Sequence, residues 1–217
     1  MNEIETIQVA DWTLKIRTPA GPGPHPVIIM LHGWTGDEDS MWIFSQRLPT
    51  NALLIAPRAP YEISSEQYNG HSWVEVRSGK WSWLDDFRPA IAALNELIAE
   101  LEHQLPGDFS KFDMVGFSQG AAMANSYTIL NPGRVGKLAG LAGFVPEGCE
   151  EAAATQPLED VNVFIAHGTQ DQIVPLERAK HAVKLMQMAG AKVHYCESES
   201  AHKLGSNCFR ALKIFFE

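Results

Sequence analysis

Short apolar runs alternate with helical patterns along this chain, and this alternation limits the possible fold more than any other feature. The runs that predict strands cover residues 27–31, 52–56, 112–117, 137–145, 161–166 and 193–196. Apolar residues at helical spacing, with start and stop signals, predict helices over 86–104, 119–130, 176–189 and 204–216. Strands that alternate with helices form a mostly parallel central sheet with helices on both faces.

The order of these elements leaves room for only one structural unit. Residues 6–17 predict a β-hairpin with its turn near Ala10 and Asp11. The chain contains no internal repeat and no low-complexity linker, and its 217 residues are close to the minimum for such a fold. We therefore predict a single α/β domain over residues 1–217, without a separate lid domain.

Charge and hydropathy exclude several classes of partner. Lysine and arginine total 17 against 26 acidic residues, a formal net charge of −9. Nucleic acids and anionic membranes bind cationic surfaces, so we expect neither nucleic-acid binding nor stable membrane association. No apolar stretch approaches the ~18 residues of a membrane span, and the first residues lack the apolar core of a signal peptide. A cytoplasmic location is predicted, and nothing in the sequence specifies an oligomeric state.

The cysteines do not indicate a disulfide framework or a metal site. Cys149, Cys196 and Cys208 are odd in number and form no C-x-x-C pair, so reduced thiols are predicted. His194, Cys196, His202 and Cys208 do not have the spacing of a common zinc site. The sequence also lacks a phosphate loop and a dinucleotide-binding fingerprint, so we expect no metal and no organic cofactor.

The segment Gly116-Phe-Ser-Gln-Gly120 contains a candidate nucleophile. It follows a predicted strand and opens a predicted helix, which is the context of a nucleophile elbow. The serine of such an elbow lies in a strained turn, where side chains at the glycine positions would collide with the neighbouring strand and helix. Ser118 is therefore the predicted nucleophile, and the start of the helix favours negative charge beside it.

A serine hydroxyl needs an adjacent base that is oriented by a third group. After a nucleophile elbow, the acid and then the histidine follow along the chain. Asp171 lies just past a predicted strand, and His202 lies in the loop between the last strand and the last helix. His181 falls inside a helix and His194 on a strand. We therefore predict Asp171 as the orienting acid and His202 as the base.

Two backbone N–H groups are expected to stabilise an oxyanion beside the serine. One belongs to Gln119, the residue after the nucleophile. The other belongs to Trp34, in a loop where Gly33 lets the backbone expose that N–H. His32 and His167 each follow a predicted strand, and we expect their rings to brace the local backbone rather than to act as bases.

Residues 58–88 are rich in aromatic side chains and lack helical periodicity over much of their length. A loop of this length beside a strand end is usually functional. Tyr61, Trp73, Trp81 and Trp83 are therefore predicted to line an apolar substrate pocket. The alternative for each tryptophan is that it packs beneath the loop.

Together these motifs resemble the α/β-hydrolase superfamily, and within it the phospholipase/carboxylesterase family, which includes acyl-protein thioesterases. The resemblance covers nearly the whole chain and rests on Leu31-His-Gly-Trp34, Ala56-Pro-Arg-Ala-Pro60, Gly116-Phe-Ser-Gln-Gly-Ala-Ala122, His167-Gly-Thr-Gln-Asp-Gln-Ile-Val-Pro175 and Ala201-His202. It implies an α/β-hydrolase fold with Ser118, Asp171 and His202 as triad and Trp34 and Gln119 as oxyanion donors. The family usually has Gly-His in place of Ala201-His202, and Leu-Gly-Asp in place of Trp34-Thr-Gly-Asp37. A tryptophan there is expected to narrow the acyl pocket.

The expected activity is the hydrolysis of carboxyl esters. Ser118 would form an acyl-enzyme with small to medium soluble esters, and water activated by His202 would release the acid. An acyl-thioesterase or lysophospholipase with the same triad is the alternative within enzymes. The alternative outside enzymes is a non-catalytic protein that binds a ligand in the same crevice. The expected partner is a small-molecule ester.

Overall fold

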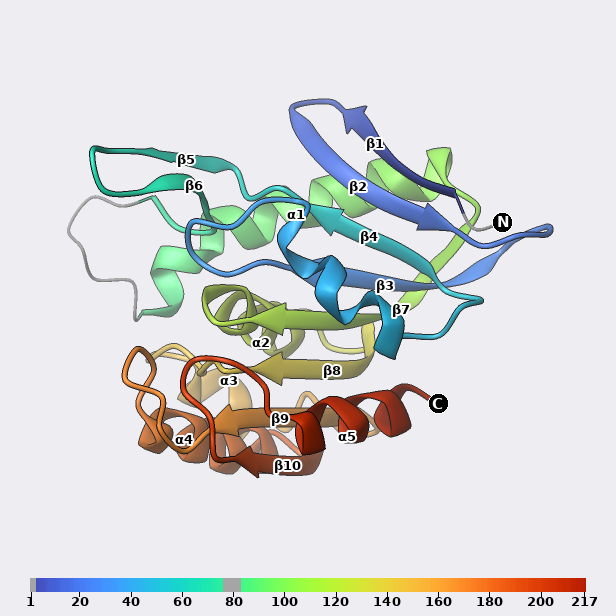
Figure 1. Ribbon diagram of the computed structural model, residues 1–217. Coiled ribbons are helices and arrows are strands. Elements are labelled where there is room, and N and C mark those ends of the chain that lie inside the picture. The colour runs from blue at the N-terminus through green and yellow to red at the C-terminus, as the bar shows by residue number, and fades with distance from the viewer. Residues whose placement is uncertain (1–2, 76–82) are drawn as a thin grey trace.

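The computed structural model describes residues 3–75 and 83–217, and its centre is a twisted, mostly parallel β-sheet (Figure 1). The strand order is β1-β2-β4-β3-β7-β8-β9-β10. The strands are β1 (Glu3–Val9), β2 (Trp12–Thr18), β3 (His25–Leu31), β4 (Leu53–Pro57), β7 (Gly107–Phe117), β8 (Val135–Leu141), β9 (Asn162–Gly168) and β10 (Lys192–Ser198). Among the described residues of this sheet, the β1–β2 and β2–β4 pairs are antiparallel and the pairs from β4 to β10 are parallel.

Helices cover both faces of this sheet. They are η1 (Ser40–Arg47), α1 (Leu84–Gln104), α2 (Gln119–Leu130), α3 (Glu150–Ala154), α4 (Leu176–Met188) and α5 (Ser206–Phe216). One face packs against η1 and α5, and the other against α1, α2 and α4 (Figure 1). Within the described ranges, none of these helices is long and apolar enough to cross a membrane.

The apolar runs form strands because both of their faces are buried. In β3, Val27, Ile29 and Leu31 point to the face covered by α1 and α2. Ile28 and Met30 point to the opposite face, covered by η1 and α5. Because successive side chains of a strand alternate between faces, a run without polar residues is what such a strand requires. The parallel sheet with helices on both faces is confirmed.

Most of the helices and strands predicted from the sequence are present in the structure, although their first and last residues differ. The N-terminal hairpin turns at Ala10 and Asp11, as expected. The predicted strand 137–145 ends earlier, at Leu141, because Ala142 adopts a φ of 48° and the chain leaves the sheet. The sequence analysis missed η1, α3 and a separate hairpin of β5 (Tyr61–Ser64) and β6 (Asn69–Ser72). These elements span only four to eight residues, too few for an apolar period to stand out.

The prediction of three reduced thiols is wrong. Cys196 on β10 and Cys208 on α5 form a disulfide, with their Cα atoms 5.8 Å apart. The bond depends on α5 packing back over β10, an arrangement that cysteine spacing alone does not reveal. Cys149 is free and buried, and burial raises the pKa of its thiol to about 11. A thiol in such surroundings is chemically inert at neutral pH.

Candidate active site

The three residues predicted to act together lie at the carboxyl ends of strands β7, β9 and β10. Ser118 follows β7 and caps the N-terminus of α2, Asp171 follows β9, and His202 lies in the loop between β10 and α5. In a parallel sheet these strand ends share one edge, which is where ligands bind in open α/β folds. Residues far apart in the sequence are thereby brought to one place.

Ser118 occupies a sharp turn that depends on the two glycines of its motif. Its φ of 54° and ψ of −116° are unusual for a residue with a side chain, and its N–H donates to the Leu141 carbonyl at 2.8 Å. A Cβ atom on Gly116 would lie 2.3 Å from the Gly120 carbonyl oxygen. A Cβ atom on Gly120 would lie 2.1 Å from the Leu31 carbonyl oxygen. The collisions expected from the sequence are therefore present.

Hydrogen bonds connect the serine, the histidine and the aspartate in series. His202 Nε2 lies 2.9 Å from Ser118 Oγ, and His202 Nδ1 lies 2.7 Å from Asp171 Oδ2. The other carboxylate oxygen of Asp171 accepts the backbone N–H groups of Ile173 at 2.9 Å and Val174 at 3.0 Å. With Nδ1 donating to the carboxylate, Nε2 is left to accept the serine proton.

The histidine loop and the aspartate loop are held against each other by their backbones. Thr169 N–H donates to the Ser198 carbonyl at 2.9 Å, and Gln170 N–H donates to the Ser200 carbonyl at 3.0 Å. The His202 ring rests against the Phe117 ring, with centroids 5.1 Å apart. The Asp171 side chain is fully buried, whereas the His202 side chain remains 17% exposed. The site is therefore preorganised but open to a ligand.

The two predicted oxyanion donors belong to segments that adjoin this serine. Gln119 is the first residue of α2, where a helix leaves its N–H groups without intrahelical partners. Gly33, which precedes Trp34, packs against the elbow, since a Cβ atom on it would lie 3.3 Å from Ser118 Cβ. Neither the Trp34 N–H nor the Gln119 N–H meets an acceptor within the described part of the chain. Both are therefore available to a developing oxyanion.

The expectation that His32 and His167 brace the backbone is confirmed. The N–H of Ala59 donates to His32 Nε2 at 2.9 Å, so the proton of this ring lies on Nδ1, 2.7 Å from the Gly33 carbonyl. His167 Nε2 lies 2.8 Å from the Val174 carbonyl, beside the loop of Asp171. Burial lowers the pKa of His32 to about 4, so this ring stays neutral at neutral pH.

The burial of His32 predicts a specific loss of stability in mild acid. The unfolded chain binds a proton at this side chain below its usual pKa of 6.5, whereas the folded chain does not until about pH 4. Lowering the pH from 7 to 5 should therefore reduce the free energy of unfolding by about 2 kcal/mol through this residue. Urea unfolding at both pH values measures the effect.

The control for this experiment is an exposed histidine. In His32→Asn the difference between pH 7 and pH 5 should shrink by that amount, whatever the substitution does to stability at pH 7. His103→Asn alters an exposed ring near the end of α1 and should keep the wild-type difference. An unchanged difference in His32→Asn would show that other groups cause the acid sensitivity.

The four residues predicted to line the substrate pocket lie in different surroundings. Trp73 is fully buried and packs against the rings of Trp12 and His32, so its assignment to the pocket is wrong. Its side chain is drawn inward because its indole N–H donates to the His32 carbonyl at 2.7 Å. Trp83 is 57% exposed beside the start of α1, and Trp81 lies outside the described residues. Tyr61 lines a cavity.

Trp34 lines two cavities. One, of about 310 Å³, is lined by Gly33, Trp34, Thr35, Gly36, Ser40, Met41, Ile43, Phe44 and Phe117. The other, of about 610 Å³, includes Trp34, Pro60, Tyr61, Glu62, Ile63 and Tyr68 under the β5–β6 hairpin. The Trp34 ring packs on Tyr68 with centroids 4.8 Å apart. The sequence analysis missed the apolar side chains of η1, although Met41 and Phe44 have helical spacing.

An ion pair that the sequence analysis did not single out holds the loop of Trp34. Arg58 Nε and Nη2 donate to the two carboxylate oxygens of Glu38, each at 2.7 Å. These hydrogen bonds hold the pKa of Glu38 below its usual value. The signal was present, because Arg58 lies in one of the motifs that carry the family resemblance. The pair joins the loop after β3 to the loop after β4.

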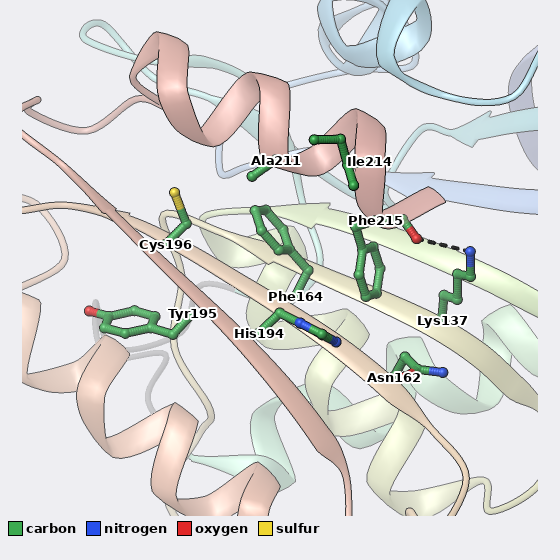
Figure 2. A pocket seen from close by; sticks show the side chains of 9 residues that line it. All are labelled: Lys137, Asn162, Phe164, His194, Tyr195, Cys196, Ala211, Ile214 and Phe215. Carbon is green, nitrogen blue, oxygen red and sulfur yellow. Dashed lines mark hydrogen bonds between the residues drawn. The ribbon is translucent and has the colours of Figure 1, made fainter. Parts of the chain in front are cut away.

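A further cavity, of about 540 Å³, lies between α5 and strands β9 and β10 (Figure 2). Phe164 and Phe215 form much of its wall, and Lys137 Nζ donates to the Phe215 carbonyl at 2.9 Å. None of the predicted catalytic residues lines this cavity. Among the described residues, no group of three or more His, Cys, Asp and Glu side chains is arranged to hold a metal ion.

A mostly parallel sheet whose central strand leads into a serine elbow defines this protein as an α/β-hydrolase. The chain belongs to the phospholipase/carboxylesterase family, whose sequence profile matches residues 14–217, and it is a serine hydrolase. Acyl-protein thioesterase 1 of Debaryomyces hansenii is 29% identical over 184 residues, which cover 76% of this chain and 78% of that relative. The same protein of Yarrowia lipolytica is 27% identical over 181 residues, with the same coverage.

Solved structures share the fold at lower sequence identity. A Bacillus cereus carboxylesterase has a TM-score of 0.80 and 19% identity, covering 95% of this chain and 94% of its own. A carboxylesterase from Mesorhizobium loti has a TM-score of 0.79 and 20% identity, covering 96% and 97%. At these identities the comparison supports the α/β-hydrolase fold, which the sequence motifs also predict.

Proposed function

We propose that residues 1–217 form a single hydrolase domain that cleaves small to medium carboxyl esters through Ser118, His202 and Asp171. The observation that carries this proposal is the unbroken series of hydrogen bonds from Ser118 Oγ through the His202 ring to Asp171. A strained elbow, an oriented imidazole and two unoccupied N–H groups form the minimal set of parts for acyl transfer.

The reaction follows from the position of each proton. Ser118 Oγ attacks the ester carbonyl carbon while His202 Nε2 takes the hydroxyl proton, and the carbonyl oxygen becomes an oxyanion that accepts the N–H groups of Trp34 and Gln119. When this tetrahedral intermediate collapses, the bond to the alcohol breaks and His202 donates its proton to the leaving oxygen. Water then attacks the acyl-enzyme with the same base, and Ser118 is regenerated. Asp171 stabilises the imidazolium in both halves.

The cavity beside the Trp34 N–H supports a small to medium acyl group. The side chains of Met41, Phe44 and Phe117 give this space of about 310 Å³ an apolar part, beside the polar side chains of Thr35 and Ser40. Trp34 lines both this cavity and the larger one under the β5–β6 hairpin, and on this proposal its indole ring limits the length of the acyl chain. An ester whose acyl part ends at this ring fits the site best.

Thioester hydrolysis is the second candidate, because the curated relatives are named acyl-protein thioesterases. The same serine, base and oxyanion donors serve a thioester, whose leaving group is a thiol in place of an alcohol. The relevant measurement is kcat/KM for oxygen esters and thioesters with the same acyl group, over a series of acyl lengths. A preference for short oxygen esters supports the first proposal, and a preference for long-chain thioesters replaces it with the second. Long-chain lysophospholipids in the same series test the lysophospholipase alternative.

Labelling with a fluorophosphonate tests the nucleophile itself. The probe should modify one residue, identified as Ser118 by mass spectrometry of peptides, and heat-unfolded protein should not react. Absence of labelling in the folded protein would favour a non-catalytic protein that binds a ligand in the same crevice. The cytoplasmic location and the lack of stable membrane association and nucleic-acid binding stay predictions. The Cys196–Cys208 disulfide counts against a cytoplasmic location, since such bonds are uncommon in reducing compartments.

A further inference from the structure

The residues Ser72 and Trp73, at the exit of the β5–β6 hairpin, lie between the two peptides that carry the proposed oxyanion donors. Both side chains are completely buried, although the hairpin that leads to them is largely exposed. Buried polar groups need hydrogen-bond partners, so the polar atoms of these two residues must be paired inside the protein.

Trp73 contacts the peptide that leads to Trp34. Its indole Nε1–H donates to the backbone carbonyl of His32 at 2.7 Å, and its ring packs on the His32 ring with centroids 5.3 Å apart. The His32 ring in turn bonds the Gly33 carbonyl through Nδ1. The backbone immediately before Trp34 is thus held at two successive carbonyls.

The side chain of Gln119 connects the same segment to the second donor. Gln119 is fully buried, its Oε1 accepts the backbone N–H of Trp73 at 3.0 Å, and its Nε2 donates to Ser72 Oγ at 3.0 Å. The Ser72 hydroxyl donates to the Val74 carbonyl at 2.7 Å, which leaves the oxygen oriented toward the Gln119 amide. The residue whose N–H faces the oxyanion is therefore fixed through its own side chain.

The hairpin also forms backbone hydrogen bonds with the loop that follows Trp34. Thr35 N–H donates to the His71 carbonyl, and His71 N–H donates to the Gly36 carbonyl, each at 3.0 Å. Gly70 permits this contact, because a Cβ atom there would lie 2.1 Å from the Thr35 carbonyl oxygen. One continuous set of contacts therefore runs from the Trp34 loop through the hairpin to Gln119.

We infer that Ser72 and Trp73 are positioning residues that set the separation of the two oxyanion donors. This inference rests on the proposed function, since it assumes that the N–H groups of Trp34 and Gln119 act on the oxyanion. Two donors on different loops must converge on one oxygen, and a shift of about 1 Å in either weakens the transition-state interaction. The indole N–H of Trp73 and the Ser72–Gln119 contact hold the two loops at one spacing.

Trp73→Phe removes the indole hydrogen bond and also leaves a smaller ring, a change in size that the Trp12→Phe control below repeats. We expect kcat for a p-nitrophenyl ester to fall about tenfold or more with KM nearly unchanged, because only the transition state uses both donors. Trp12→Phe is the matched control: Trp12 packs against Trp73 with ring centroids 6.4 Å apart but lies on the N-terminal hairpin. Its kcat should remain at the wild-type value.

A trifluoromethyl ketone provides a readout that loss of stability alone would not change. Ser118 adds to its carbonyl carbon, the serine proton passes to His202, and the ketone oxygen becomes an oxyanion facing the two donors. The inhibition constant should rise in Trp73→Phe by the same factor by which kcat/KM falls, measured on folded protein at 25 °C. A fall in kcat/KM without weaker ketone binding would overturn the inference, and so would wild-type values of both.

Ser72→Ala is an independent test, because it changes the contact with Gln119 and leaves the contact with His32 in place. If Trp73→Phe does not fold, the result for Ser72→Ala alone tests the inference. This substitution removes the acceptor of the Gln119 amide and should weaken ketone binding and kcat/KM together, by about tenfold. Ser126→Ala is its control, a buried serine on α2 that donates to the Ala122 carbonyl. Failure of the proposed function is recognised separately, because wild-type protein would then not react with a fluorophosphonate at Ser118.

Discussion

Replacing Ser118 by alanine should reduce kcat for a p-nitrophenyl ester by about 10⁵-fold while leaving the folded structure intact. The loss is this large because the hydroxyl forms the covalent bond in the first step and no other side chain stands within hydrogen-bond reach of His202 Nε2 in the described structure. Some rate above that of water should remain, since the oxyanion donors and the binding cavity are untouched. Initial rates at high enzyme concentration measure it.

We expect Ser118→Ala to change the stability of the fold very little, so a loss of activity in this variant would not result from unfolding. Ser118 Oγ bonds only to His202 among the described residues, and its backbone conformation is maintained by the flanking glycines. Far-UV circular dichroism and the urea midpoint should match those of the wild type, and labelling by a fluorophosphonate should disappear. Turnover within tenfold of the wild type would rule out Ser118 as the nucleophile.

Asp171→Asn should lower kcat by about 10³–10⁴-fold, because it moves the proton of the His202 ring to the wrong nitrogen. The Oδ1 atom of Asp171 accepts two backbone N–H groups, from Ile173 and Val174. An asparagine must keep its carbonyl oxygen toward these donors, which turns its NH₂ group toward His202 Nδ1. The ring then carries its proton on Nε2, facing Ser118, and can no longer accept the serine proton.

The control for this variant is Asp11→Asn, an exposed aspartate in the turn of the N-terminal hairpin, which should retain full activity. The pH profile adds a second readout. Activity in Asp171→Asn should recover partly at high pH, where hydroxide replaces the missing base. A loss of less than tenfold at neutral pH would indicate that Asp171 does not orient the histidine.

The three candidate catalytic residues could be placed from the sequence because local chemistry determines their positions. A serine between two glycines, after an apolar run and before a helix, has few other structural explanations. Asp171 and His202 followed from the rule that functional side chains lie past the ends of parallel strands. The structure brings all three within hydrogen-bond distance in series. Their catalytic roles stay predictions until the variants above are measured.

The features that the sequence analysis missed depend on contacts between distant segments. Trp73 was assigned to a pocket because aromatic residues in a long loop suggest one, yet its direction is decided by a carbonyl at His32. The Cys196–Cys208 bond likewise requires α5 to fold back over β10. The polar hairpin of β5 and β6 is stabilised by contacts with residues 32–36 and Gln119 rather than by its own apolar pattern. The spacing of apolar residues along the chain does not reveal which distant segments will come into contact.

The order of the strands also has a consequence for the synthesis of this enzyme. Ser118 follows β7 in the middle of the sheet, whereas Asp171 and His202 follow β9 and β10, which are synthesised after β7. Domains form as the chain emerges, N-terminal parts first. A chain that has folded only through β7 and α2 therefore has the proposed nucleophile but neither the proposed base nor the proposed acid. On the proposed function, hydrolysis requires that β9 and β10 have joined the sheet.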